Sequence, residues 1–163
     1  MDVHIRKATT QDAPALADLL HKIGYFARIN QEPLKTTQDR VARHLELANA
    51  DRSHSVYVAE EHTGTLLGYA AVHWLPYLIL SGPEGYVSEL FLDEPARGQG
   101  IGRKLLDVIR GEAAERGCSR LSLLNRRDRE SYQRQFYAKV GWQEREDMAN
   151  FVFPLPEKSS PGG

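Results

Sequence analysis

Three glycines alternate with other residues at one point in the chain, after a predicted strand and before a predicted helix. They belong to the segment Arg97-Gly98-Gln99-Gly100-Ile101-Gly102-Arg103-Lys104. Glycine has no Cβ, so the backbone can approach a ligand closely and point its N–H groups at it. Because a helix N-terminus leaves amide donors unpaired and carries partial positive charge, this segment predicts a cradle for a phosphate group.

The charged side chains around this helix start support the same interpretation. It carries Arg97, Arg103 and Lys104, and no acidic residue follows until Asp107. Cations are unfavourable at the positive end of a helix unless an anion binds there. The alternative is a tight turn with solvated basic residues, but three glycines between a strand and a helix favour phosphate binding. The spacing fits neither a Walker A loop nor the dinucleotide fingerprint Gly-x-Gly-x-x-Gly.

Hydrophobic periodicity predicts a mixed α/β chain with antiparallel hairpins and one β-α-β unit near the middle. Predicted strands cover residues 3–7, 55–60, 65–74, 85–92 and 121–124, and residues 142–146 and 150–153 are expected to form a closing hairpin. Four helices are predicted: one begins at Thr10, a second begins at Thr37, a third runs from Ile101 to Ala113, and a fourth covers residues 132–139. The 163 residues fit a single domain, expected over residues 1–156, with a flexible tail over residues 157–163.

Composition excludes several partner classes. The net charge of −1 gives no argument for nucleic acid or a membrane surface as the main partner. Cys118 is the single cysteine, so no internal disulfide can form and a reducing, cytoplasmic compartment is expected. The six histidines show no metal-ligand spacing, so no metal is expected.

At this point the sequence resembles the GNAT superfamily of N-acetyltransferases. The pyrophosphate motif of that family, Arg/Gln-x-x-Gly-x-Gly/Ala, is matched by residues 97–102. Residues 89–95 resemble the family's fourth strand, and residues 136–142 resemble its aromatic-Tyr-x-x-x-Gly-aromatic segment. The resemblance covers roughly residues 3–153. It implies the acyl-CoA N-acyltransferase fold, in which helices flank a central, mostly antiparallel sheet, and it implies acetyl-CoA as the co-substrate.

The resemblance also assigns roles to individual residues. Acetyl-CoA would bind between the fourth and fifth strands, and its pantetheine would pair with backbone groups of Phe91 and Leu92. The implied pyrophosphate contacts come from Arg97, Gly98, Gly100, Gly102 and Arg103. Two positions differ from the family pattern, because Glu130 stands where an asparagine is frequent and Asn125 where some members carry a glutamate base. A homodimer is expected from the resemblance alone.

Acetyl transfer to an amine requires a neutral amine, a stabilised thioester oxygen and a protonated leaving group. Glu89 is the candidate base, and the alternative is a surface or ion-paired glutamate. Tyr137 is the candidate acid, and the alternative is a half-buried packing aromatic. Tyr25 and Phe26 fall where the family places variable acceptor-binding loops, where they would line a pocket or form a subunit contact.

These observations lead to three hypotheses about function. The first is an enzyme that acetylates a small-molecule amine. The second is an enzyme that acetylates a protein N-terminus or lysine. The third is a noncatalytic acyl-CoA-binding regulatory module, which would keep Gly98, Gly100 and Gly102 without depending on Glu89 or Tyr137.

Overall fold

The computed structural model describes residues 2–158, so most of the tail expected over residues 157–163 lies outside the described residues. The chain divides into two compact units, Met1–Leu124 and Asn125–Gly163. The first unit contains a five-stranded sheet in the order β1-β2-β3-β4-β5. Its strands are β1 (Val3–Lys7), β2 (His54–Glu61), β3 (Leu66–Leu75), β4 (Glu84–Leu92) and β5 (Arg120–Leu123). Neighbouring strands are antiparallel except β4 and β5, which are parallel.

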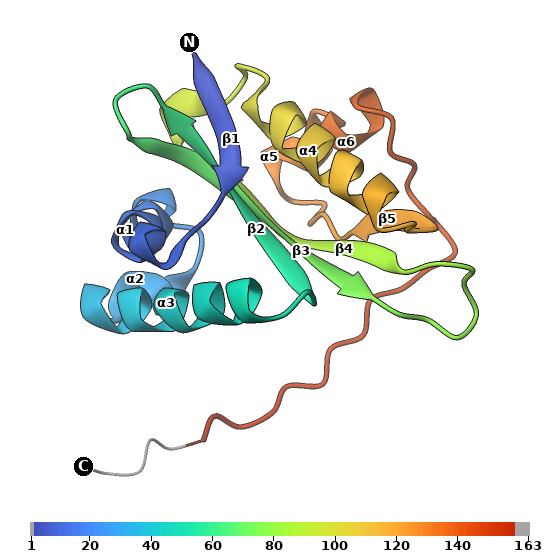
Figure 1. Ribbon diagram of the computed structural model, residues 1–163, viewed down its shortest axis with the longest axis horizontal. Helices are drawn as coiled ribbons and strands as arrows, with labels where there is room; N and C mark the ends of the chain where they lie inside the picture. The colour runs from blue at the N-terminus through green and yellow to red at the C-terminus, as the bar shows by residue number, and fades with distance from the viewer. Residues whose placement is uncertain (1, 159–163) are drawn as a thin grey trace. The chain divides into compact units, whose positions relative to one another are not determined.

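The helices of the first unit lie on both faces of the sheet. They are α1 (Ala13–Ile23), α2 (Ala27–Gln31), α3 (Leu34–Ala50) and α4 (Ile101–Glu115), with 3₁₀ turns at Thr10–Asp12 and Glu94–Ala96. Figure 1 shows α1 and α3 on one side of the sheet and α4 on the other. Thus a central, mostly antiparallel sheet flanked by helices, as the sequence predicts, is what the structure contains.

The start of α1 differs in detail from the prediction, because Thr9 rather than Thr10 makes the cap. Thr9 and Asp12 form a capping box in which the Thr9 amide donates to Asp12 Oδ2 at 2.7 Å. The guanidinium of Arg6 on β1 also binds both oxygens of Asp12, at 2.8 Å each. These contacts, led by the hydrogen bond from Arg6, lower the pKa of Asp12 and fix the chain where it leaves β1 for α1.

The predicted second helix begins earlier than expected, at Leu34 rather than Thr37, and the short α2 before it was not predicted. Thr37 lies inside α3 as a fully buried side chain, where its hydroxyl donates to Glu32 at 2.6 Å. Pro33 occupies the position before the helix, where its missing N–H costs nothing. Threonine therefore contributes a buried hydrogen bond here instead of a helix cap.

Each face of the sheet has its own apolar layer. On the α1–α3 face, one cluster contains Ala8, Ala13, Leu16, Leu19, Leu20, Leu45, Val58, Leu66 and Tyr69. On the opposite face, α4 buries Ile101, Gly102, Leu105, Leu106, Ile109 and Ala113. The spacing of three and four residues places these α4 side chains in one stripe, and each large one stabilises the fold by about 1.5–3 kcal/mol.

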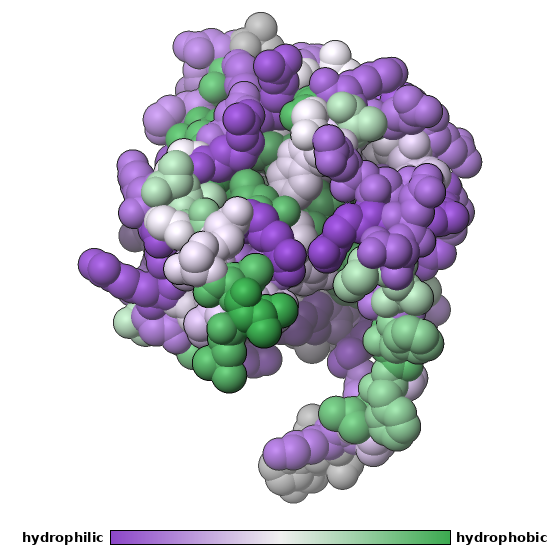
Figure 2. Space-filling model, turned by 90° about the vertical axis from the view of Figure 1, so that its right-hand side faces the viewer, coloured by the Kyte–Doolittle hydropathy of each residue, from purple (hydrophilic) through white to green (hydrophobic). Residues whose placement is uncertain are grey.

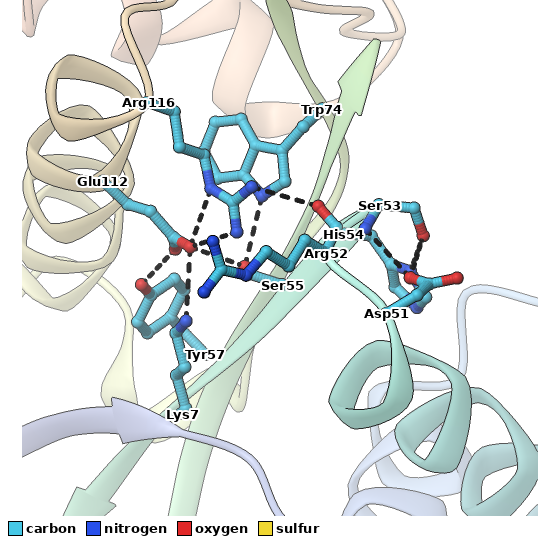
Figure 3. Close-up of polar contacts among 10 residues, drawn as sticks. All are labelled: Lys7, Asp51, Arg52, Ser53, His54, Ser55, Tyr57, Trp74, Glu112 and Arg116. Carbon is cyan, nitrogen blue, oxygen red and sulfur yellow. Dashed lines mark hydrogen bonds and ion pairs between the residues drawn. The ribbon is translucent and has the colours of Figure 1, made fainter.

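A half-buried carboxylate joins the second half of α4 to the sheet (Figure 3). Glu112 accepts hydrogen bonds from Tyr57, from Ser55 at 3.0 Å, from Arg116 at 2.9 and 3.0 Å, and from Lys7 at 3.2 Å. Burial acts to raise the pKa of Glu112, but these hydrogen bonds, that of Tyr57 first, bring it below its usual value. The network fixes the direction of α4 and thereby the position of its N-terminus.

The second unit has less regular structure than predicted. The helix expected over residues 132–139 is divided into α5 (Glu130–Gln133) and α6 (Phe136–Lys139). Gln135 separates them with φ of 55°, a left-handed conformation that an α-helix cannot contain. The division therefore depends on the backbone of one residue.

The predicted closing hairpin is wrong, because residues 142–146 and 150–153 form no strand. Pro154 and Pro156 follow the second segment and remove two backbone donors that a sheet would need. Its large side chains remain exposed, at 91% for Phe151 and 87% for Phe153. In Figure 2 the segment leading to the grey C-terminal residues accordingly carries hydrophobic side chains. Within the described part of the chain, no helix is long and apolar enough to cross a membrane.

Candidate functional site

The outer edge of β4 is paired over less than half of its length. β5 pairs with β4 from Glu84 to Val87 and then ends, so residues 88–92 have no strand partner on that edge within residues 2–158. On the inner edge, the β3–β4 register shifts between Ala71 and Val72, which leaves Ser88 as the extra residue of a β-bulge. The bulge lies where β4 leaves β5, so the open edge begins at a defined point.

The backbone direction alternates along this open edge. The amide of Asp93 donates to the carbonyl of Leu67 on β3 at 2.8 Å. Because antiparallel pairs alternate, Phe91 directs its backbone groups toward β3, whereas Leu90 and Leu92 direct theirs toward the open edge. The expected backbone pairing of a ligand therefore suits Leu92 and Leu90. The N–H and C=O of Phe91 face the inner strand.

The glycine loop, residues 97–102, follows the 3₁₀ turn after β4 and runs into the first residues of α4. Gly98 and Gly100 have φ of 74° and 78°, left-handed values that favour glycine, and a Cβ on either would meet no atom within 4 Å. The first amide of this stretch bonded back to the loop is that of Lys104, to Gly100 at 3.1 Å. Within the described residues, no acceptor is bonded to the amides of residues 98–103. The loop thus presents consecutive free N–H donors beside open space.

The three cations of the loop are placed differently. Arg97 is turned back, with Nε and Nη2 each 3.4 Å from the carbonyl of Leu92 and its guanidinium 5.3 Å from the ring centre of Tyr25. Arg103 is exposed, with a distant 3.8 Å ion pair to Asp107. Lys104 is also exposed, and no acidic partner within residues 2–158 pairs with it. Arg103 and Lys104 are therefore the two cations left for an anion at the start of α4.

Glu89 lies on β4 with its side chain on the face that α1 and α3 cover. The residue is exposed, and its Oε1 accepts a hydrogen bond from the hydroxyl of Tyr69 at 3.1 Å. Within the described residues, Tyr69 is the only donor to this carboxylate, so Oε2 is left for another group. Burial first, and then the neighbouring Glu89, raise the pKa of Tyr69 well above its ordinary value, which keeps this hydroxyl a donor.

Four aromatic rings cluster around Phe91 and include that of Tyr69, whose hydroxyl donates to Glu89; we call these rings the aromatic wall. Phe91 is its centre, at 6.1 Å from the ring of Tyr25, 5.3 Å from that of Phe26 and 6.0 Å from that of Tyr69. Tyr25 and Phe26 come from the connection between α1 and α2, and Tyr25 is 38% exposed. Glu89 and Phe91 are two residues apart on one strand, so the carboxylate and the wall share a face.

The remaining predicted residues belong to the second unit. The rings of Phe136 and Trp142 lie 4.9 and 6.2 Å from the ring of Tyr137, and burial raises the pKa of Tyr137 to about 12. The amide of Asn125 donates to Ser131 at 2.9 Å. Glu130 forms a 3.5 Å ion pair with Arg134 across one turn. Both Asn125 and Glu130 therefore already have a side-chain partner.

A cavity of about 310 Å³ lies at the other end of α4, away from the glycine loop. Its lining includes Lys7, Asp51, Arg52, His54 and Arg116, two of which take part in the Glu112 network. Among residues 2–158, no group of three or more His, Cys, Asp or Glu side chains is placed to hold a metal ion. The glycine loop, the open edge of β4 and Glu89 thus form the candidate site in the first unit.

Tyr69 is the functional candidate that sequence analysis missed. It lies in a strand as one apolar-looking residue among several, and only the pairing of Tyr69 with Phe91 brings its hydroxyl to Glu89. The signal that could have indicated it is its place two residues before Ala71, the residue that pairs with Glu89. Reading that signal requires the register of β3 and β4.

Comparisons with known proteins identify the family of this chain. The model of the Acetyltransferase (GNAT) family matches residues 19–142. The acetyltransferase Atu2258 of Agrobacterium fabrum is 37% identical over 81 residues, which cover 48% of this chain and 52% of that protein. Glucosamine 6-phosphate N-acetyltransferase 1 of Oryza sativa subsp. japonica is 29% identical over 133 residues, which cover 80% and 78% of the two chains.

Solved structures share the fold as well. A structure described as a transcriptional regulator from Bacillus halodurans C-125 matches with a TM-score of 0.80 and 25% identity, over 93% of this chain and all of that chain. The glucosamine-6-phosphate N-acetyltransferase structure from Arabidopsis thaliana matches with a TM-score of 0.71 and 22% identity, over 94% of this chain and all of that chain. With the family model matching three quarters of its length, the chain belongs to the Acetyltransferase (GNAT) family and is an acetyl-CoA-dependent N-acetyltransferase.

Proposed function

We propose that this protein transfers the acetyl group of acetyl-CoA to a primary amine of a small molecule, by direct attack while both substrates are bound. The observation that carries the proposal is that two features meet at β4. β4 presents an open backbone edge that leads into unpaired amides at residues 98–103, and it also carries the exposed carboxylate of Glu89. A site for a phosphate-bearing thioester and a site for an amine are therefore adjacent.

The residues present fit acetyl-CoA. The free amides of residues 98–103 and the N-terminal end of α4 suit a pyrophosphate, and Arg103 and Lys104 add positive charge. The outward backbone groups of Leu90 and Leu92 suit the amides of pantetheine, as an added strand would. The guanidinium of Arg97 also donates to the carbonyl of Leu92, which helps to hold the end of this edge in place.

Glu89 would supply the base. An amine is mostly protonated near neutral pH, so its ammonium must lose a proton before nitrogen can attack. The carboxylate holds one oxygen toward Tyr69 and keeps the other for the ammonium. The N–H of Leu90, which faces the open edge, is the donor available for the negative charge that develops on the thioester oxygen.

Tyr137 would supply the acid, an assignment that follows from the family resemblance and from its chemistry. Its pKa of about 12 keeps the hydroxyl protonated at neutral pH. The C–N bond forms as the C–S bond breaks, and sulfur receives the proton of Tyr137. The amine releases two protons overall, one to Glu89 and one that replaces the proton given by Tyr137.

The small-molecule acceptor is favoured by one relative. The rice protein similar over four fifths of this chain is named as a glucosamine 6-phosphate N-acetyltransferase. The alternative, a protein N-terminus, is supported by a structure titled ribosomal-protein-alanine N-acetyltransferase from Brucella melitensis, with a TM-score of 0.72 and 25% identity. Our further proposal of a cytoplasmic homodimer rests on the single Cys118 and on the family resemblance.

The first test is isothermal titration of the purified protein with acetyl-CoA, followed by CoA release in the presence of a panel of primary amines. We expect acetyl-CoA to bind and at least one small amine to accelerate CoA release. Binding without acceleration by any small amine, together with acetylation of a peptide N-terminus, would favour the protein-directed alternative. No binding at all would contradict the proposed function.

A further inference from the structure

The acceptor side of the site has a chemical character of its own, set by the aromatic wall beside Glu89. Phe91 contacts the other three rings, and Phe26 meets it edge to face at 5.3 Å with an interplanar angle of 89°. Phe26 and Phe91 are half-buried, and Tyr25 is exposed, so part of the wall faces solvent. Exposed rings that are fixed by one another present apolar area at little cost in conformational entropy.

Two cations close to the wall in the chain or in space are already engaged. Arg97 stacks on Tyr25 and reaches the carbonyl of Leu92. Lys22, near the end of α1, pairs with Asp93 at 2.5 Å. Glu89 is therefore the charged group next to the wall that keeps an oxygen without a donor among the described residues.

This pattern distinguishes between classes of amine. A sugar phosphate would require hydrogen-bond partners for its hydroxyls and free cations for its phosphate. The rings of Phe26 and Phe91 supply neither, and the hydroxyl of Tyr69 already donates to Glu89. An amine attached to a flat apolar group would place its ammonium at Glu89 and its apolar group on the rings. Two positions along a strand span about 6.6 Å, which suits a spacer of about two carbons between the amine and the ring.

Resting on the proposed function, we propose that the acceptor is a primary amine that carries an aromatic or similarly flat apolar group, held by Phe26 and Phe91 with its ammonium at Glu89. The wall acts as the specificity surface, and Glu89 orients the reacting nitrogen. Cation–π attraction between the ammonium and the ring faces adds to the ion pair.

The test uses three amines at saturating acetyl-CoA, with CoA release as the readout. The amines are 2-phenylethylamine, ethylamine as the same amine without the ring, and glucosamine 6-phosphate. We expect kcat/KM for 2-phenylethylamine to exceed that for ethylamine by at least about tenfold. Equal use of 2-phenylethylamine and ethylamine, or a preference for glucosamine 6-phosphate, overturns the inference while the proposed function stands.

Variants locate the effect on the wall. Phe26→Ala is expected to lower kcat/KM for 2-phenylethylamine about tenfold, to leave that for ethylamine within about twofold, and to leave acetyl-CoA affinity unchanged. Leu47→Ala is the control, because this side chain is 54% exposed on α3. Its loss should leave kcat/KM unchanged for both amines. Phe26→Leu keeps apolar volume and should lose less than Phe26→Ala. An equal loss for both amines in Phe26→Ala overturns the role of the ring.

Failure of the inference and failure of the proposed function give different results. Acetyl-CoA binding without transfer to any of the three amines overturns the inference on the acceptor and leaves the cofactor site in place. Absence of acetyl-CoA binding in the titration overturns both.

Discussion

The glycine loop and the Glu89 side of β4 are close in the chain, yet they would recognise their ligands by different means. The loop offers backbone N–H groups, and the lack of a side chain at Gly98 and Gly100 leaves room for a ligand to reach them. The Glu89 side offers side chains: a carboxylate, the hydroxyl of Tyr69 and a set of rings. Backbone recognition tolerates little added volume, whereas side-chain recognition can change its ligand through single substitutions.

Gly100→Glu should have the largest effect, because it tests the backbone half directly. A side chain at φ of 78° is strained, and its carboxylate would repel a pyrophosphate at the start of α4. We expect acetyl-CoA affinity to fall at least about 100-fold in isothermal titration, as more than 2.7 kcal/mol of binding energy is lost. Gly111→Ala is the matched control, since this glycine is exposed inside α4 with ordinary φ and room for a Cβ. Unchanged affinity in Gly100→Glu would contradict the cradle.

Glu89→Gln tests the side-chain half and should come second. The amide keeps the shape of the carboxylate but cannot take a proton, so kcat should fall about 10²- to 10⁴-fold. Acetyl-CoA affinity should stay within about twofold, which separates this variant from Gly100→Glu. Glu94→Gln, an exposed glutamate in the 3₁₀ turn after β4, is the control and should retain the wild-type rate. A Glu89→Gln enzyme with full kcat would assign the base to another group.

Tyr137→Phe tests the proposed acid, which belongs to the second unit and to neither of the two regions compared. Loss of the donor should lower kcat about tenfold with little change in KM for the amine. Because the pKa of Tyr137 is about 12, its ionisation should cause no decline of the wild-type rate below about pH 11. A variant with unchanged kcat would make Tyr137 a packing residue.

Tyr69→Phe should have the smallest effect on rate, about threefold in kcat, because it removes only the hydrogen bond that holds Glu89. It should also change stability at alkaline pH. The pKa of Tyr69 is raised in the folded protein, so its contribution is complete below the unfolded value of about 10 and declines as pH rises above it. The free energy of unfolding of Tyr69→Phe should therefore decline less steeply above about pH 10, as measured by urea denaturation. An identical alkaline slope in both proteins would contradict the shift.

Much of the first unit could be predicted from the sequence. The strand over residues 3–7 and the helix after the glycine loop have clear periodicity, and both lie where they were predicted. In the second unit, the local residue types misled the prediction. Residues 151–153 are a run of aromatic and β-branched side chains, which favour a strand, but a strand also needs a partner, and this segment has none among the described residues. Pattern alone cannot supply that partner.

The sequence by itself determined the family, the glycine loop and the strand that carries Glu89, because each depends on neighbouring residues whose chemistry is local. Only the tertiary structure decided which backbone groups of β4 face outward, that Tyr69 reaches Glu89, and that Tyr25 and Phe26 join Phe91. These contacts join residues about 20 to 66 positions apart in the chain. Their formation depends on strand register and on helix packing across a face, which no single stretch of sequence specifies.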